Sequence, residues 1–275
     1  NKNAPAAFTP EQVADLVVRP VLEASVASQV STIVRTGSAQ FRIPVVGADV
    51  AAEWVEEGEE ITPSDPNLGE IIVTPAKVAA LTILSNELAS DGSPEAAAMV
   101  GESIARDLAR KIDLAFFGDL DAPAPPGLGG LTNVTELAAG ATVTNLDVFA
   151  EALAVAEAAS TAITAWVAHP DDALKLSQLK EATGSARPLL QPDATAPTRR
   201  LIQGVELFSS PAVEEGTIWG LPKTRVLLVV RQDTTLAVDA SPFFTSDRTA
   251  VRGTMRIGFG FTDQTAIAKI VLSGS

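Results

Sequence analysis

Few residues of this chain could perform acid–base chemistry. Its one histidine, His169, stands in the sequence HPDD beside Asp171 and Asp172. A histidine next to a carboxylate could act as a general base, but it would also need an oriented nucleophile, as in a Ser-His-Asp triad. A helix is predicted to begin just after His169, and the helix dipole stabilises acids in a first turn. We therefore interpret His169 as a cap residue and expect no catalytic site there.

Metal, cofactor and nucleotide sites also lack their usual residues. The chain has no cysteine and a single histidine, which excludes disulfides, thiolate chemistry and clusters of cysteine or histidine ligands. The run EWVEEGEE, Glu53–Glu60, could bind calcium or supply a glycosidase carboxylate pair. It lacks the ligand spacing of a calcium loop, however, and no pocket is expected around it. Gly127, Gly129 and Gly130 fit a linker better than a phosphate-binding loop. We expect no cofactor, no metal and no enzymatic activity.

Charge is the most informative pattern in the chain. The segment from Ile43 to Ala76 has no lysine or arginine, and the whole chain carries a formal charge of −14. This segment contains eight acids: Asp49, Glu53, Glu56, Glu57, Glu59, Glu60, Asp65 and Glu70. Glycines and prolines divide it into turns, and it has too few apolar residues to form a core of its own. We expect a projecting acidic loop that lies on the basic surface of another copy, which predicts a protein built to assemble.

Several basic residues outside this segment are candidates for receiving its charge. Arg248, Arg252 and Arg256 recur at a spacing of four in a predicted strand, which places them on one face. Trp54 would supply apolar contact between copies, while charge would set register and partner choice. The full set of candidate inter-subunit contacts is Glu53, Trp54, Glu56, Glu57, Glu59, Glu60, Lys77, Arg106, Arg110, Arg248, Arg252 and Arg256. Ordinary solvated surface charge remains the alternative interpretation of the basic residues.

Strand signals occur in two parts of the chain. Residues 40–46 and 70–84 would carry the acidic loop out and back as a long hairpin. From 217 to the end the pattern is nearly all β, with a continuous apolar run at 225–231. The simplest arrangement returns these C-terminal strands to pack on a long helix. Residues 125–221 would then be inserted as a second domain of helices and short strands.

The long helix is predicted over 94–117. Ser93 is a good N-cap, Pro94 suits the first helical position and Gly118 is placed to end the helix. Between them apolar residues repeat every four positions: Val100, Ile104, Leu108, Ile112 and Phe116. The Pro/Gly-rich stretch 121–130, DAPAPPGLGG, follows as the best domain boundary. Together these signals predict an α+β fold.

The overall charge also bounds the partners of the chain. With 34 acids against 20 bases, the surface should repel the phosphates of nucleic acid rather than bind them. No apolar run approaches the roughly 18 residues that a membrane-spanning helix needs, so no membrane partner is expected. The chain begins with Asn1 rather than Met, which fits either a trimmed chain or a leader removed by a protease.

Taken in order, these parts resemble the major capsid proteins of tailed bacteriophages, which have the Hong Kong 97-type shell fold. The resemblance covers nearly the whole chain. It rests on LSNELASD before the long helix, RDLARKIDLAFFGD along it, RPLLQPD in a long loop and MRIGFGFTDQTAIAKIVL at the end. It implies an N-terminal arm over 1–40, an extended E-loop hairpin over 41–77 and a P-domain over 78–124 (spine helix) and 222–275 (C-terminal strands). The inserted A-domain would span 125–221.

The resemblance implies a structural function. Members of this family assemble as pentamers and hexamers into an icosahedral head shell, which encloses double-stranded DNA without sequence-specific binding. Portal, scaffold, protease and cement proteins are implied partners, and the start at Asn1 would fit proteolytic maturation. The implied location is the virion, after assembly in the host cytoplasm. An encapsulin, a cellular compartment shell with the same fold, is the alternative.

One activity of the family is not expected here. Some members form isopeptide crosslinks, which need an E-loop lysine, a P-domain asparagine and a nearby glutamate. The acidic segment has no lysine. Matching the tail MRIGFGFTDQTAIAK to the family places Asp247 near the asparagine position and Thr254 at the glutamate position. The resemblance therefore implies a noncovalent shell.

Overall fold

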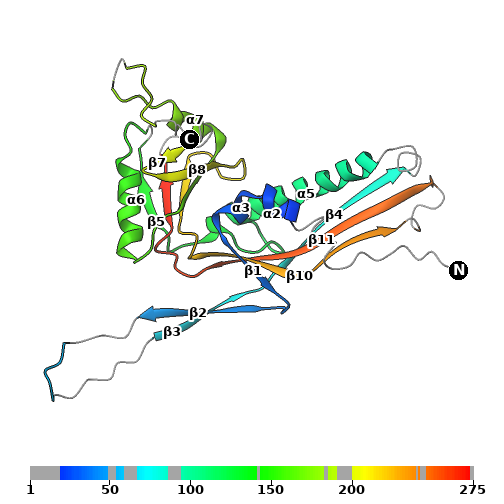
Figure 1. Ribbon diagram of the computed structural model, residues 1–275, viewed down its shortest axis with the longest axis horizontal. Helices are drawn as coiled ribbons and strands as arrows, with labels where there is room; N and C mark the ends of the chain where they lie inside the picture. The colour runs from blue at the N-terminus through cyan, green and yellow to red at the C-terminus, as the bar shows by residue number, and fades with distance from the viewer. Residues whose placement is uncertain are drawn as a thin grey trace.

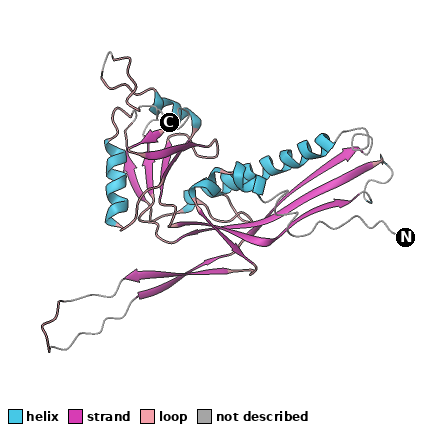
Figure 2. Cartoon of the chain, in the orientation of Figure 1, coloured by secondary structure: helices cyan, strands magenta, loops and turns pink. Residues whose placement is uncertain are grey.

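The computed structural model describes residues 19–48, 54–58, 67–85, 94–140, 143–182, 185–190, 200–239, 241 and 246–272. These residues form two larger sheets and a hairpin that projects from them (Figure 1). One sheet has four strands in the order β1-β10-β11-β4, and the other has six in the order β5-β12-β9-β6-β8-β7. Helices accompany both sheets, which confirms the α+β class (Figure 2).

Helix α5, Pro94–Phe117, lies along one face of the four-stranded sheet (Figure 1). The strands of that sheet are β1 (Thr32–Thr36), β10 (Val226–Asp239), β11 (Arg248–Phe261) and β4 (Ala76–Ser85). The four-residue repeat of the helix packs on β11 in one core, which contains Ile104, Leu108, Ile112 and Phe116 with Met255, Ile257 and Phe259. The predicted helix is confirmed, although Ser93 and the side chain of Val100 lie outside the described positions.

Two short helices at the start of the described chain, α2 (Arg19–Ala24) and α3 (Val26–Val30), pack on α5. The buried carboxylate of Asp113 on α5 anchors them. It accepts three hydrogen bonds, from Ser25 Oγ at 2.6 Å, the Ala27 amide at 3.0 Å and the Val26 amide at 3.1 Å. Burial raises the pKa of Asp113, and the three hydrogen bonds act in the opposite direction.

The acidic segment is carried by a hairpin of β2 (Phe41–Ala48) and β3 (Asn67–Val73). The prediction of one continuous returning strand over 70–84 is wrong, because β3 ends before Pro75 and β4 begins after it. Proline has no N–H to donate to a continuous ladder. On the two sides of this break, β3 pairs with β2 in the hairpin, whereas β4 pairs with β11 at the edge of the four-stranded sheet.

The base of the hairpin rests on β11 because two glycines leave room for it. In MRIGFGF, residues 255–261, the phenylalanines are buried in the core beneath α5. The glycines lie on the opposite face of the strand. A Cβ at Gly258 would lie 2.6 Å from Val73 Cγ1, and one at Gly260 would lie 2.9 Å from Ile43 Cδ1. Alternating phenylalanine and glycine therefore let one strand support the helix on one face and the hairpin on the other.

The second sheet packs with α6 (Asp147–Ala158) and α7 (Pro170–Ser177) in a second core, while Val167 and Trp219 of its strands join the core that contains α5. Its strands are β5 (Thr135–Ala138), β12 (Ala268–Val271), β9 (Thr217–Leu221), β6 (Ala165–Ala168), β8 (Val205–Ser209) and β7 (Leu201–Ile202). The rings of Phe149 and Trp166 meet edge to face in its core, with centroids 5.0 Å apart. The 3-10 turn Leu128–Gly130 lies on the path from α5 to β5.

The last strand departs from the expected domain boundary. Residues 222–275 were expected to belong wholly to the P-domain, but β12 pairs with β5 and β9 in the six-stranded sheet. Ala268 and Ile270 are fully buried in the core of that sheet. The expectation is therefore wrong for this strand. The other boundaries stay a proposal. Separately, none of the helices in the described ranges has the length and apolarity that a membrane crossing requires.

Candidate assembly surfaces

The tip of the hairpin presents apolar side chains to solvent. Trp54 is 106% exposed and Val55 is 38% exposed. Tryptophan is a frequent anchor of protein–protein contacts, because it buries a large area with few rotatable bonds. Covering the tip with another molecule therefore lowers the free energy of the system.

Acidic residues follow this apolar pair. Glu56 and Glu57 are exposed, and Gly58 turns the chain with a φ of 98°. The remaining predicted contacts of the loop, Glu53, Glu59 and Glu60, lie outside the described residues. Nearer the body, Arg42 Nη1 lies 2.8 Å from Oε1 of Glu70 on the other strand of the hairpin. One acid of the segment is thus neutralised within the chain at the hairpin base, whereas Glu56 and Glu57 lie at its far end.

The face of the four-stranded sheet opposite α5, which we call the outer face, combines basic and apolar side chains. Side chains along β11 point alternately to the two faces of the sheet. Met255 and Ile257 lie in the core with α5, so Arg252 lies on the outer face. Leu81 of β4 stands opposite Arg252 in the register. Leu81 and Ile83, two positions further on, are 63% and 42% exposed. The outer face therefore offers exposed apolar area beside a guanidinium group.

Positive charge is concentrated on the outer face. Arg256 stands in register between Lys77 of β4 and Arg231 of β10. Arg252 and Arg248 follow along β11 and are exposed. Like charges opposite one another in a sheet repel. One acid lies on the same face, because Asp239 of β10 stands opposite Ala250 of β11. The sequence prediction included these cations except Arg231, which could have been found at the end of the run RVLLVVR.

The predicted contacts on the long helix lie on a different surface. Arg106 and Arg110 are exposed, whereas Ile104 and Leu108 of the same helix are buried against the sheet. Arg106 Nη1 also lies 3.5 Å from Oε2 of Glu102, one turn earlier. The cations of α5 and those of the outer face therefore lie on opposite sides of the sheet and do not form one site.

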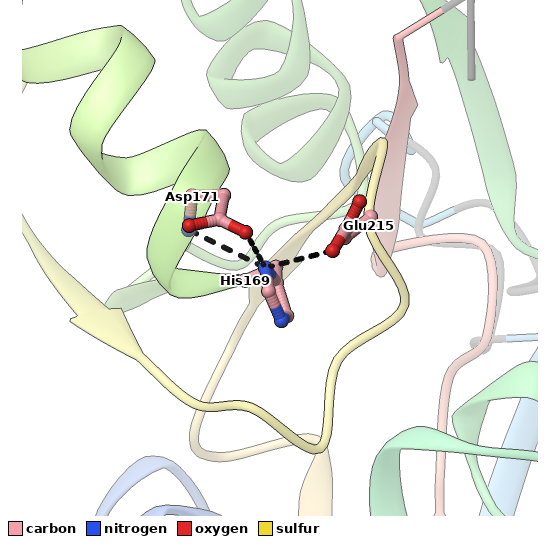
Figure 3. Close-up of side chains that lie close together, drawn as sticks. All are labelled: His169, Asp171 and Glu215. Carbon is pink, nitrogen blue, oxygen red and sulfur yellow. Dashed lines mark hydrogen bonds and ion pairs between the residues drawn. The ribbon is translucent and has the colours of Figure 1, made fainter.

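His169 is a helix cap, as the sequence predicts. Its Nδ1 accepts a hydrogen bond from the Asp171 amide, with the two nitrogens 3.3 Å apart, at the start of α7 (Figure 3). The neighbouring Asp172 is fully buried and accepts a hydrogen bond from the Gly216 amide at 2.7 Å. This bond holds the loop that carries Glu215 beside His169, a proximity that no local sequence pattern reveals.

Comparisons with known proteins agree with this architecture. Among solved structures, the chain is similar to the capsid of an empty GTA particle computed with C5 symmetry. The TM-score is 0.75 at 17% identity, over 91% of this chain and 90% of that one. It is also similar to a chain of Microbacterium phage Oxtober96, with a TM-score of 0.71 and 17% identity over 90% of each chain. For a chain of Mycobacterium phage Adephagia, the TM-score is 0.71 at 16% identity, over 90% of this chain and 89% of that one.

A search of curated protein sequences found no significant match. At 16–17% identity, the solved structures show a shared fold, which confirms the Hong Kong 97-type architecture. The family model described as "Phage capsid family" matches residues 6–272, which is nearly the whole chain. This match favours a capsid protein over the encapsulin alternative. On the strength of that match, this chain belongs to the phage capsid family.

Proposed function

We propose that this chain is the major capsid protein of a tailed phage and assembles with its own copies into an icosahedral shell around double-stranded DNA. Family membership over residues 6–272 and the shared fold support this function. The observation that best supports self-assembly is the projecting hairpin, because Trp54 at its tip is 106% exposed. An exposed apolar tip costs free energy in a monomer and becomes contact area once a neighbour covers it.

The surface that we propose for the tip of a neighbouring copy is the outer face. Leu81 on that face is apolar like Trp54 of the tip. Arg252, which stands opposite Leu81, has the opposite charge to Glu56 and Glu57 of the tip. Arg106 of α5 is less suitable, because Oε2 of Glu102 on the same helix lies 3.5 Å from its Nη1. Figure 1 places the hairpin tip and the far end of β4 on opposite sides of the molecule, so the contact requires a second copy.

Apolar contact would supply most of the affinity. A tryptophan buries roughly 150–250 Å². At about 25 cal/mol per Å² this gives roughly 4–6 kcal/mol, before the costs of ordering the loop and docking the chains. Exposed ion pairs contribute only about 0–1 kcal/mol each, so charge sets register and partner choice. The same contact repeated around a closed shell then gives a large total stability.

The shell is proposed to be noncovalent. The acidic segment has no lysine to form an isopeptide bond. Thr254, which the resemblance places at the glutamate position, has no carboxylate, and its hydroxyl lies 2.7 Å from the Thr235 hydroxyl. In mature particles boiled in denaturant, this chain is expected to run on a gel at the mass of a single copy. A ladder of this chain at multiples of that mass would contradict a noncovalent shell.

The remaining partners belong to the same proposal. The C5 symmetry of the GTA capsid supports pentamers, and the resemblance adds hexamers. Portal, scaffold, protease and cement proteins are proposed partners, and no membrane partner is proposed. We propose assembly in the host cytoplasm, proteolytic maturation and a final location in the virion. We propose no enzymatic activity. The net charge of −14 supports enclosure of DNA without sequence-specific binding, since a wall that held phosphates tightly would hinder packaging.

Electron microscopy and size-exclusion chromatography of the expressed chain test this function. We expect closed shells that elute ahead of any single chain and that contain DNA when produced during infection. Particles filled with a protein cargo instead of DNA would support the encapsulin alternative. A chain that stays monomeric under every solvent condition would overturn the proposal.

A further inference from the structure

We infer that His169, Asp171 and Glu215 form a binding site for a divalent transition-metal ion, with zinc as its representative. Each residue offers one ligand atom, and all three atoms lie within 4.8 Å of one another (Figure 3). His169 Nδ1 lies 3.5 Å from Asp171 Oδ2 and 3.9 Å from Glu215 Oε1. A tetrahedral zinc ion with bonds of about 2.0–2.2 Å needs ligand atoms roughly 3.3–3.6 Å apart. Only small side-chain movements separate this arrangement from a coordinating one.

The donor set selects the class of ion. An imidazole nitrogen favours zinc and its first-row neighbours, whereas calcium and magnesium prefer oxygen ligands alone. The imidazole of His169 is 18% exposed, while the side chains of Asp171 and Glu215 are 64% and 59% exposed. An ion can therefore arrive from solvent, and water can complete its coordination shell.

A buried carboxylate that is not itself a ligand fixes the segments that carry the ligands. Asp172 is fully buried, and its Oδ2 accepts a hydrogen bond from the Gly216 amide at 2.7 Å. Gly216 has a φ of 81°, in the region that favours glycine, and its carbonyl accepts a hydrogen bond from the Leu272 amide at 2.7 Å. These bonds fix the loop that carries Glu215 against the first turn of α7. A bound ion would therefore join α7 to the loop before β9.

The local charge favours a cation at this place. Asp171 and Glu215 are both ligands, and Asp172 adds a third carboxylate next to them. Lys175 pairs with the third of these carboxylates, since its Nζ lies 2.8 Å from Asp172 Oδ1. Asp172 raises the pKa of Lys175 most, and Glu215 and Asp171 raise it further. The charge of Lys175 is thus matched by Asp172, which leaves the two ligand carboxylates to face the ion.

The capping bond competes with the ion but is weak. The lone pair of His169 Nδ1 accepts a hydrogen bond from the Asp171 amide, and the N···N distance of 3.3 Å is long for such a bond. The same lone pair would bind the metal. Because Nδ1 accepts, the neutral ring carries its proton on Nε2, which is the tautomer that coordination through Nδ1 requires. The amide released on binding is exposed and can donate to water.

The single histidine makes the test direct. Tag-free protein is loaded with zinc and studied by calorimetry, thermal unfolding and X-ray absorption, in which imidazole scattering can come only from His169. We expect one zinc per chain, an imidazole in its shell and a higher midpoint of unfolding. His169→Asn keeps an N-cap acceptor but removes the imidazole, and Glu215→Gln removes a ligand charge. Each should weaken zinc binding by about tenfold or more.

Glu214→Gln is the matched control, because it removes the same charge one position away from the ligand and should leave zinc affinity unchanged. Equal zinc affinity in the wild type and in His169→Asn would overturn the inference, as would a zinc shell without imidazole. Calcium or magnesium binding as tightly as zinc would do the same, since it would indicate general attraction to acidic side chains. These readouts do not depend on shell assembly, so the inference stands or falls separately from the proposed function.

Discussion

At the scale of single residues, buried carboxylates fix the architecture, whereas exposed side chains carry the proposed contacts. Asp113 and Asp172 each accept hydrogen bonds from backbone amides of distant segments. The exposed set could be predicted from the sequence, because charge and spacing are local. The partners of Asp113 could not, since Ser25 lies 88 positions away and no periodic pattern connects them.

The anchoring role of Asp113 predicts a clear loss of stability. Asp113→Ala would leave the amides of Val26 and Ala27 and the hydroxyl of Ser25 without their acceptor. We expect the free energy of unfolding to fall by roughly 2–4 kcal/mol, measured by denaturant titration with circular dichroism. Asp107→Ala, an exposed change on the same helix, should shift it by no more than about 0.5 kcal/mol. Equal effects of the two changes would argue against the anchor.

At the scale of elements, local signals located the helices and strands better than they located strand pairing. The helix predicted over 94–117 coincides with α5, because caps and a four-residue repeat act within a turn or two. The strand predicted over 40–46 corresponds to β2, and the run 225–231 corresponds to the first half of β10. The pairing of β12 with β5 and β9 was missed, because it depends on segments far apart in the chain.

The seating of the hairpin on β11 can be tested with one glycine. Gly258→Val would place its Cβ 2.6 Å from Val73 and push the hairpin base off the sheet. We expect a loss of about 1–3 kcal/mol in the free energy of unfolding and faster proteolysis within the hairpin. Gly101→Ala, in α5 with nothing within 4 Å of the added Cβ, should instead stabilise the chain by about 0.5–1 kcal/mol. A Gly258→Val variant as stable as the wild type would contradict this seating.

At the scale of the whole molecule, the chain holds an acidic, apolar tip and a basic, apolar face that lie apart from each other (Figure 1). The charge pattern of the sequence predicted that such surfaces exist and that they meet between copies. It did not predict that the basic residues divide between two sides of a sheet. That division follows from α5 covering one face of β11, which only the packing reveals.

Charge reversal tests the proposed pairing of these surfaces. Glu56→Lys with Glu57→Lys should leave the circular dichroism of the chain unchanged but sharply reduce the yield of sedimenting shells. Adding Arg248→Glu and Arg252→Glu to the same chain should restore part of that yield, because opposite charges face each other again. Normal shells from the first variant would refute the electrostatic role of the tip.

The most direct measurement of the central claim uses the absence of cysteine from this chain. Two single variants, Val55→Cys and Leu81→Cys, are assembled together and oxidised, and the products are separated on a non-reducing gel. Tip-to-face contact between copies predicts a disulfide-linked dimer that appears only when both variants are present. In the control, Ile33→Cys replaces Leu81→Cys at another exposed apolar position and should give no such dimer. No dimer from the first mixture, or an equal amount from the control, would contradict the account.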